Sequence, residues 1–62
     1  MHKYEPGQSV RFSPHRYEDS SARGLYTIVR LLPEEGGSAQ YRIKAEVNGR
    51  ERVVREDQLT QP

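Results

Sequence analysis

An Asn48-Gly49 step between two strand-like segments restricts the fold of this chain more than any other feature. The flanking segments, Tyr41 to Val47 and Glu51 to Glu56, are both rich in residues that favour strands. Asn and Gly tolerate the positive φ angles of a tight hairpin turn, so this dipeptide between two such segments is a strong short-range hairpin signal. We therefore expect an antiparallel β-hairpin in the C-terminal third of the chain.

The sequence leaves two registers open for this hairpin. A two-residue turn would place Ile43 opposite Val54, whereas a three-residue loop ending at Gly49 would place Ile43 opposite Val53. Each register sets like charges side by side, which is mildly unfavourable, so charge does not choose between them. The like-charged pairs are Arg42 with Arg55 in the first register and Lys44 with Arg52 in the second.

Earlier in the chain, Gln8 to Phe12 alternates polar and apolar residues as a half-buried strand does. Val10 and Phe12 are expected to face inward and Arg11 outward. The polar residues that follow, up to Gly24, are predicted to form a long loop, and loops of that length are usually functional or mobile.

Leu25 to Leu32 is a continuous apolar and β-branched segment that we predict to be a central strand ended by Pro33. Its apolar residues do not all fall on one face, so we expect either a β-bulge or strong coiling in its middle, which would cover both sets. An acidic, glycine-rich turn follows, and the next strand is predicted to begin near Gln40. In that strand Tyr41, Ile43 and Ala45 share one face, and Arg42 and Lys44 share the other.

The end of the chain is predicted to form one helical turn at Asp57-Gln58-Leu59, which would place Leu59 over the open end of the sheet. Residues 1–5 and 60–62 are expected to fray, as chain termini often do. Together these elements describe an all-β fold, a single domain over residues 1–62 with five short strands arranged as a small barrel.

Composition excludes several other classes of protein. With 62 residues there is room for one domain with a thin core. Cysteine is absent, so disulfides and thiolate metal sites are excluded and a reducing, cytoplasmic location is expected. No apolar stretch approaches the roughly 20 residues that span a bilayer, and the N-terminal residues lack the apolar segment of a signal peptide, so no membrane partner is expected.

The order of these landmarks resembles that of Src-homology-3-like (SH3-like) barrels, nearest to the Tudor and KOW branches and to small bacterial proteins of unassigned function. The resemblance implies a five-stranded SH3-like barrel that binds RNA, DNA, ribosomal or polymerase surfaces, or peptides. The segments that carry it are Gly7 to Phe12, Gly24 to Val29, Tyr41 to Lys44, and Arg52 to Glu56 before Leu59.

Two binding modes of such barrels do not match this sequence. The branch that binds proline-rich peptides would require a tryptophan at the edge of its groove, and this chain has none. A methyl-lysine cage requires several converging aromatic rings. Most of the five aromatic residues here are needed for the core.

No pattern of catalytic or metal-binding residues is present in the sequence. There is no cysteine nucleophile and no Gly-rich phosphate-binding loop, and His2 and His15 lack the spacing of a metal site. The paired acids Glu34 and Glu35 are typical of a solvated turn. We therefore expect no enzymatic activity, no cofactor and no metal.

Binding remains as the function class, and the arrangement of the cations supports it more than the net charge does. The ten Lys and Arg residues almost balance nine Asp and Glu residues, giving +1. Arginines held in rows on strands can follow a phosphate backbone, and a loop tyrosine can stack on an unpaired base. We predict a nucleic-acid or ribonucleoprotein binding surface. Its candidate residues are Arg11, Arg16, Tyr17, Arg30, Arg42, Lys44, Arg52 and Arg55.

Two alternatives stay open. The arginines can instead pair with Glu46, Glu51 and Glu56 in a solvated face that protects the sheet from aggregation. The chain can also be a protein-interaction adaptor or a homodimer, because Leu25 and Leu31 have no obvious place in a thin core. The sequence does not choose between RNA and DNA, and it does not give the oligomeric state.

Overall fold

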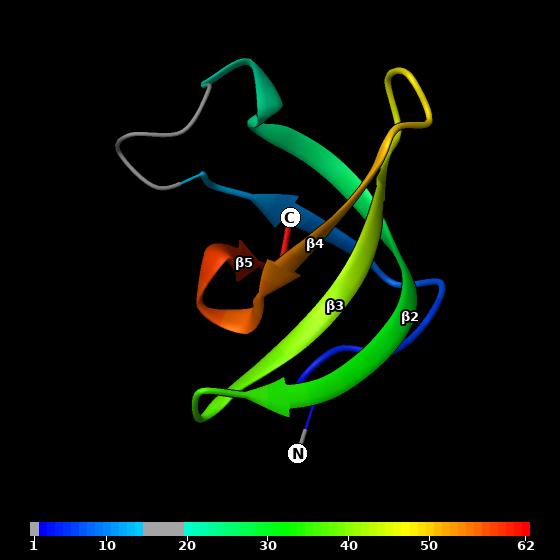
Figure 1. The fold of residues 1–62 in the computed structure, drawn as a ribbon. Coiled ribbons are helices and arrows are strands. Elements are labelled where there is room, and N and C mark those ends of the chain that lie inside the picture. Colours follow the sequence, from blue (N-terminus) through cyan, green and yellow to red (C-terminus); the bar gives the residue numbers. More distant parts are fainter. Residues whose placement is uncertain (1, 15–19) are drawn as a thin grey trace.

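The computed structural model describes residues 2–14 and 20–62 and contains one antiparallel sheet of five strands. The strands lie in the order β4-β3-β2-β1-β5 (Figure 1). The all-β prediction is confirmed, and the five strands are accompanied only by two 3-10 turns in the described residues. The elements are β1 Ser9–Phe12, η1 Ser20–Ala22, β2 Gly24–Glu35, β3 Ser38–Ala45, β4 Glu51–Arg55, η2 Glu56–Gln58 and β5 Leu59–Thr60.

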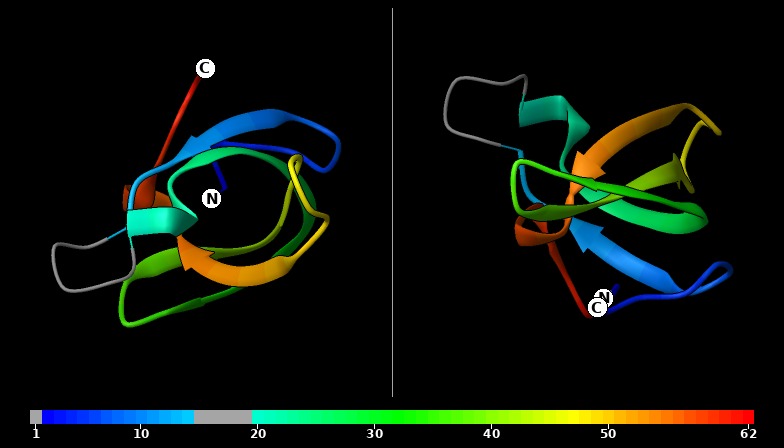
Figure 2. Two further views of the ribbon diagram at one scale, coloured as in Figure 1. Left: turned by 90° about the horizontal axis from the view of Figure 1, so that it is seen from above. Right: turned by 60° about the horizontal axis from the view of Figure 1, so that its bottom comes forward.

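The sheet is strongly curved, and the long strands β2 and β3 bend around the core (Figure 2). It is not closed, since β4 and β5 form its two edges and do not pair with each other. The structure therefore shows a single curved sheet, and it does not establish the closed barrel that we expected.

Period-two alternation accounts for the core. Val10 and Phe12 are fully buried and Arg11 between them is exposed, as predicted. Tyr41 and Ile43 on β3 are also fully buried, and the residues between and after them face the other side of the sheet. The buried hydrophobic residues are Tyr4, Val10, Phe12, Tyr26, Ile28, Ala39, Tyr41, Ile43, Ala45, Val54 and Leu59.

The predicted β-bulge in β2 is present at Val29. Ile28 pairs with Ile43, but Arg30 pairs with Arg42, so one extra residue lies on the β2 side. This keeps Ile28 in the core and turns Arg30 to the outer face beside Arg42.

Pro33 does not end β2 as we expected, because the strand continues to Glu35. Pro33 is exposed and lies within a second irregularity of the β2–β3 pairing, between Leu32 and Glu35. A proline is tolerated there because no paired position requires its missing N–H group. The next strand likewise begins at Ser38 and not near Gln40.

Both registers that we considered for the hairpin are wrong. Lys44 pairs with Glu51 and Ile43 with Arg52, so the loop is longer than expected. The Ala45 N–H donates to the Arg50 carbonyl at 2.7 Å, which closes a four-residue loop over 46–49. With the longer loop, Lys44 lies opposite Glu51, whereas each expected register places like charges opposite each other. Opposite charges across neighbouring strands stabilise a sheet, and like charges destabilise it.

The N-terminal segment is packed against the sheet and is not frayed in the way that we expected. Tyr4 is only 1% exposed, and its hydroxyl donates to the Leu59 carbonyl at 3.2 Å. At the other end of the chain, Thr60 pairs with Arg11. The predicted helical turn is present as η2, one residue earlier than expected, and it delivers Leu59 into the core.

Candidate functional site

Three cations stand together on the outer side of the sheet, and we call Arg30, Arg42 and Lys44 the outer basic face. Arg30 on β2 lies directly opposite Arg42 on β3. Lys44 is two residues from Arg42 along the same strand and therefore projects on the same side, as predicted. Buried Tyr41, Ile43 and Ala45 alternate with Arg42 and Lys44 along β3, and Arg30 is held beside them by the pairing of β2 with β3.

The outer basic face is only partly neutralised. Arg42 pairs with Glu51 at 3.2 Å, and both side chains are about two-fifths exposed, so this ion pair contributes little to stability. Within residues 2–14 and 20–62, no carboxylate lies within ion-pair distance of Arg30 or Lys44. The face therefore presents net positive charge to solvent.

The remaining predicted site residues do not join this face as one group. Arg55 pairs with Asp57 at 3.3 Å at the end of β4, and Arg11 lies on β1, beyond β2 in the sheet. Arg52 faces the inner side, because it pairs with buried Ile43 and lies two residues from buried Val54 on the same face of β4. Arg16 and Tyr17 lie outside the described residues.

A groove that the sequence did not indicate opens beside the inner side of β4. It has a volume of about 810 Å³ and lies between the segment Ser21–Tyr26 and the segment Ala45–Arg52. Three arginines line it, namely Arg23, Arg50 and Arg52. Only one of the two expected registers places Arg52 on the outward face, and Arg23 and Arg50 are not among the predicted site residues. The four-residue hairpin loop, which the sequence did not reveal, creates one wall.

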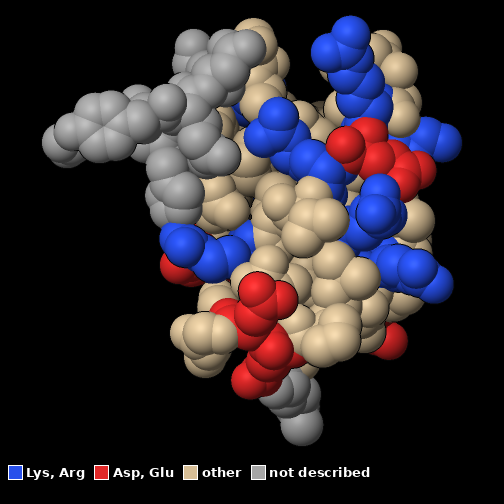
Figure 3. Space-filling view, in the orientation of Figure 1, with Lys and Arg blue, Asp and Glu red and all other residues tan. Residues whose placement is uncertain are grey.

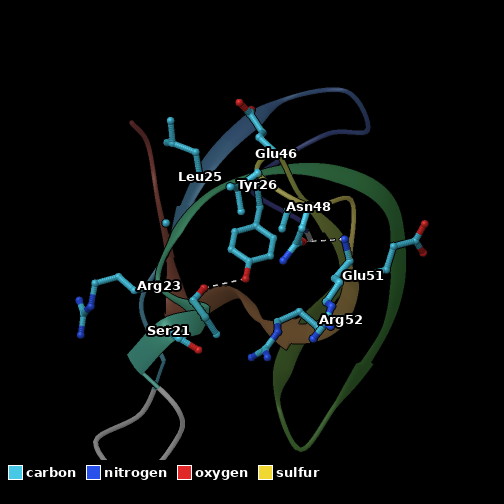
Figure 4. A pocket seen from close by; sticks show the side chains of 13 residues that line it. Ser21, Arg23, Leu25, Tyr26, Glu46, Asn48, Glu51 and Arg52 are labelled. Atoms are coloured by element: carbon cyan, nitrogen blue, oxygen red, sulfur yellow. Dashed lines mark hydrogen bonds between the residues drawn. The ribbon is translucent and has the colours of Figure 1, made fainter.

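Tyr26 lines this groove next to Arg52, and Phe12 lies in the core in contact with both side chains. The Arg52 guanidinium carbon lies 5.1 Å from the centroid of the Phe12 ring, a cation–π contact. Phe12 in turn meets Tyr26 edge-on at 5.5 Å. The Tyr26 hydroxyl donates to the Ala22 carbonyl at 2.6 Å, so the ring is held in one position (Figure 4).

The acidic residues of the groove are directed away from it. The Glu46 carboxylate accepts long hydrogen bonds from the hydroxyls of Ser9 and Thr27 at 3.5 and 3.4 Å. Glu51 is the ion-pair partner of Arg42 on the outer face. Figure 4 shows both carboxylates pointing outward while Arg52 extends below the Tyr26 ring. The interior of the groove is therefore cationic.

The two groups of cations are neighbours on the surface of the molecule. Figure 3 shows Lys and Arg side chains gathered over the upper part of one face, around the β3–β4 hairpin, with acidic side chains between them and below. Glu51 precedes Arg52 on β4 and pairs with Arg42, so it lies between the groove and the outer basic face.

The only shifted pKa values among the described residues belong to a contact elsewhere in the fold. A hydrogen bond from Tyr41 lowers the pKa of Glu56, and burial together with this hydrogen bond raises the pKa of Tyr41. The same hydroxyl accepts the N–H groups of Lys3 and Tyr4. These bonds hold the N-terminal segment in place, which is a structural role.

The described part of the chain contains no group of three or more His, Cys, Asp or Glu side chains placed to hold a metal ion. None of its helices has the length and apolar character needed to cross a membrane.

These observations define a small all-β domain with a cationic groove and an adjoining basic sheet face. No family model, no curated protein and no solved structure matches this chain.

Proposed function

We propose that this chain is a non-enzymatic module that binds nucleic acid, or the nucleic acid of a ribonucleoprotein surface, through the outer basic face. The observation that carries the proposal is the cross-strand pair of Arg30 and Arg42. Like charges directly opposite each other destabilise a sheet, so this pair brings the fold no benefit. A bound phosphate backbone would neutralise both cations at once.

The chemistry of these residues suits that ligand. Arginine presents a planar guanidinium that binds phosphate oxygens through two hydrogen bonds, and it stays charged at every physiological pH. Because β2 and β3 are paired and well packed, the cations are held at fixed spacing and lose little freedom on binding.

We also propose that the fold is an SH3-like barrel, nearest to the Tudor and KOW branches. A meander of four strands, a 3-10 turn and a short last strand that pairs with β1 support this assignment. Nucleic-acid and ribonucleoprotein binding is one of the functions that such barrels carry, and a cytoplasmic location accords with it.

Fluorescence anisotropy with a labelled RNA of about ten nucleotides, a length that covers a typical small-domain site, tests the proposal. We expect binding that weakens as salt rises, with each lost phosphate contact reducing the slope of log K against log salt by about 0.7. Arg42→Gln and Lys44→Gln should each weaken binding. The matched control is Lys3→Gln, which removes one exposed charge in the N-terminal segment. Absence of binding, or equal affinity of all four proteins, would refute the proposal.

Binding of a protein partner, including a second copy of the chain, is the second candidate. Leu25 is 43% exposed and Leu31 is 39% exposed, so neither is used fully by the core. Light scattering coupled to size exclusion distinguishes a dimer from a monomer. A salt-insensitive protein complex that excludes RNA would favour this candidate over nucleic-acid binding.

A further inference from the structure

The groove beside β4 combines cations with apolar surface in a way that the outer basic face does not. Figure 4 shows Arg52 extending below the Tyr26 ring, whereas the Arg23 side chain, from the opposite wall, is directed outward. Arg50 and Val47 line the groove from the hairpin side, and Val47 is 90% exposed. The groove therefore offers both charge and apolar contact to one occupant.

Arg52 stands where the pattern of β4 favours an apolar residue. Its Cα partner is fully buried Ile43, and Val54 on the same side of β4 is 4% exposed. A leucine at this position would cover Phe12 without bringing a charge to the inner side of the sheet. In the described residues no carboxylate pairs with Arg52, so its guanidinium edge is available to a ligand in the groove.

We propose that this groove binds a single-stranded segment of nucleic acid, with Arg50 and Arg52 on its phosphates and an unpaired base against exposed Val47. The inference rests on the proposed function, and it specifies the strand state of the ligand and adds a second contact surface. An unpaired nucleotide matches the groove because it has a charged phosphate and an apolar base face. In a duplex the base faces are stacked inside and cannot reach Val47.

Charge complementarity sets the orientation of the strand. The carboxylates of Glu46 and Glu51 point out of the groove, so the charged group below the Tyr26 ring is the Arg52 guanidinium (Figure 4). From the groove the strand passes over β4, where Glu51 is paired with Arg42, and reaches the outer basic face beyond this ion pair.

The test compares a labelled oligouridine of about ten nucleotides with a duplex RNA of the same length, at low salt, by anisotropy. We expect Arg52→Gln to weaken single-strand binding about tenfold, since arginine–base and arginine–phosphate contacts are lost together. Duplex affinity should stay within about twofold, because Arg52 faces the inner side of the sheet and would not contact a duplex bound on the outer basic face. Arg42→Gln should weaken both ligands alike.

Two further variants keep the result interpretable. Arg52→Lys retains the charge but loses the planar guanidinium, and it should recover only part of the affinity. Arg50 is exposed, so Arg50→Gln reports on the groove even if replacement of Arg52 perturbs the fold, which circular dichroism would reveal. In an amide NMR titration, oligouridine should shift the signals of Gly24, Asn48 and Arg50.

The outcomes separate the two proposals. If the wild type binds RNA but Arg52→Gln and Arg50→Gln leave single-strand binding unchanged, the groove inference is wrong and the outer basic face stands. Equal loss of single-strand and duplex binding in these variants also overturns it, as does displacement of the RNA by polyglutamate at equal charge. If the wild type binds neither RNA, both proposals fail.

Discussion

The hydroxyl of Tyr41 on β3 donates a hydrogen bond to the carboxylate of Glu56 in η2. The same hydroxyl accepts the backbone N–H groups of Lys3 at 2.8 Å and Tyr4 at 3.1 Å, and the carboxylate also accepts the Lys3 N–H at 2.7 Å. One buried ring thus joins the N-terminal segment, β3 and η2, which are far apart in the sequence.

This contact predicts an acid-dependent loss of stability. The hydrogen bond from Tyr41 lowers the pKa of Glu56 below 4.5 in the folded state. A lowered folded-state pKa contributes stability above the unfolded-state value and loses it as pH falls through the folded-state pKa. Glu56→Gln should lower the free energy of unfolding at neutral pH and flatten its decline below about pH 4.5.

Urea unfolding followed by circular dichroism over a series of pH values measures this effect. Glu35→Gln is the matched control, since Glu35 is an exposed carboxylate at the end of β2. Identical pH profiles of the two variants would contradict the assignment of the acid effect to Glu56.

Removing the hydroxyl of Tyr41 should destabilise the fold even at neutral pH. Tyr41→Phe leaves the buried N–H group of Tyr4 without its acceptor. An unsatisfied buried donor costs about 1 to 3 kcal/mol. Chemical unfolding of the variant measures the loss, and a change below about 0.5 kcal/mol, which is typical of a neutral surface substitution, would show that water or another acceptor replaces the hydroxyl.

The N-terminal segment is predicted to be essential to the core. Tyr4 is 1% exposed, so Tyr4→Ala removes a large buried ring and should cost about 3 to 5 kcal/mol, as aromatic-to-alanine changes in cores do. Val47→Ala, at a position that is 90% exposed, should change stability by less than about 0.5 kcal/mol. Equal unfolding midpoints for the two variants would show that the segment is dispensable.

The pair of Arg30 and Arg42 allows stability and binding to be separated. Arg30→Glu replaces a like-charged cross-strand pair by an opposite-charged one and should stabilise the sheet by about 0.2 to 1 kcal/mol. The same change reverses one charge of the outer basic face, so RNA binding should weaken. A variant that is both more stable and unimpaired in binding would show that these cations only form a solvated face of the sheet and do not bind RNA.

The turn of the hairpin is sensitive to its glycine. Gly49 has a φ of +75°, and a Cβ built there would lie 3.7 Å from Lys44 Cε, which is ordinary contact. The cost of Gly49→Ala therefore comes from the backbone and should be about 1 to 2 kcal/mol. Gly49→Asn should cost less, because Asn tolerates positive φ. Thermal unfolding of the two variants distinguishes them, and equal losses would point to a side-chain clash instead.

Features that depend on the residues of one β-strand or one turn were predicted well from the local sequence pattern. The inward faces of Phe12 and Ile43, the bulge in β2 and the delivery of Leu59 to the core all agree with the structure. The same alternation predicted that Arg42 and Lys44 project together on the outward side of β3. Each depends on residues within a few positions of one another.

Most of the candidate groove could not be predicted in this way. Whether Arg52 faces inward depends on the length of the hairpin loop, and a one-residue change in register moves a residue from one face of a sheet to the other. Neither of the two expected registers has this loop length. In the longer loop the Asn48 side chain accepts the Arg50 N–H, and Gly49 adopts a positive φ.

The sequence by itself determined the strands, their buried faces and the all-β class, since period-two alternation and turn residues act locally. Only the tertiary structure decided the hairpin register, the place of Tyr4 in the core and the meeting of Arg52 with Phe12. The physical reason is that these contacts join segments distant in the chain, as with Tyr4 and Tyr41, 37 positions apart. Such contacts depend on how the whole sheet curves and packs.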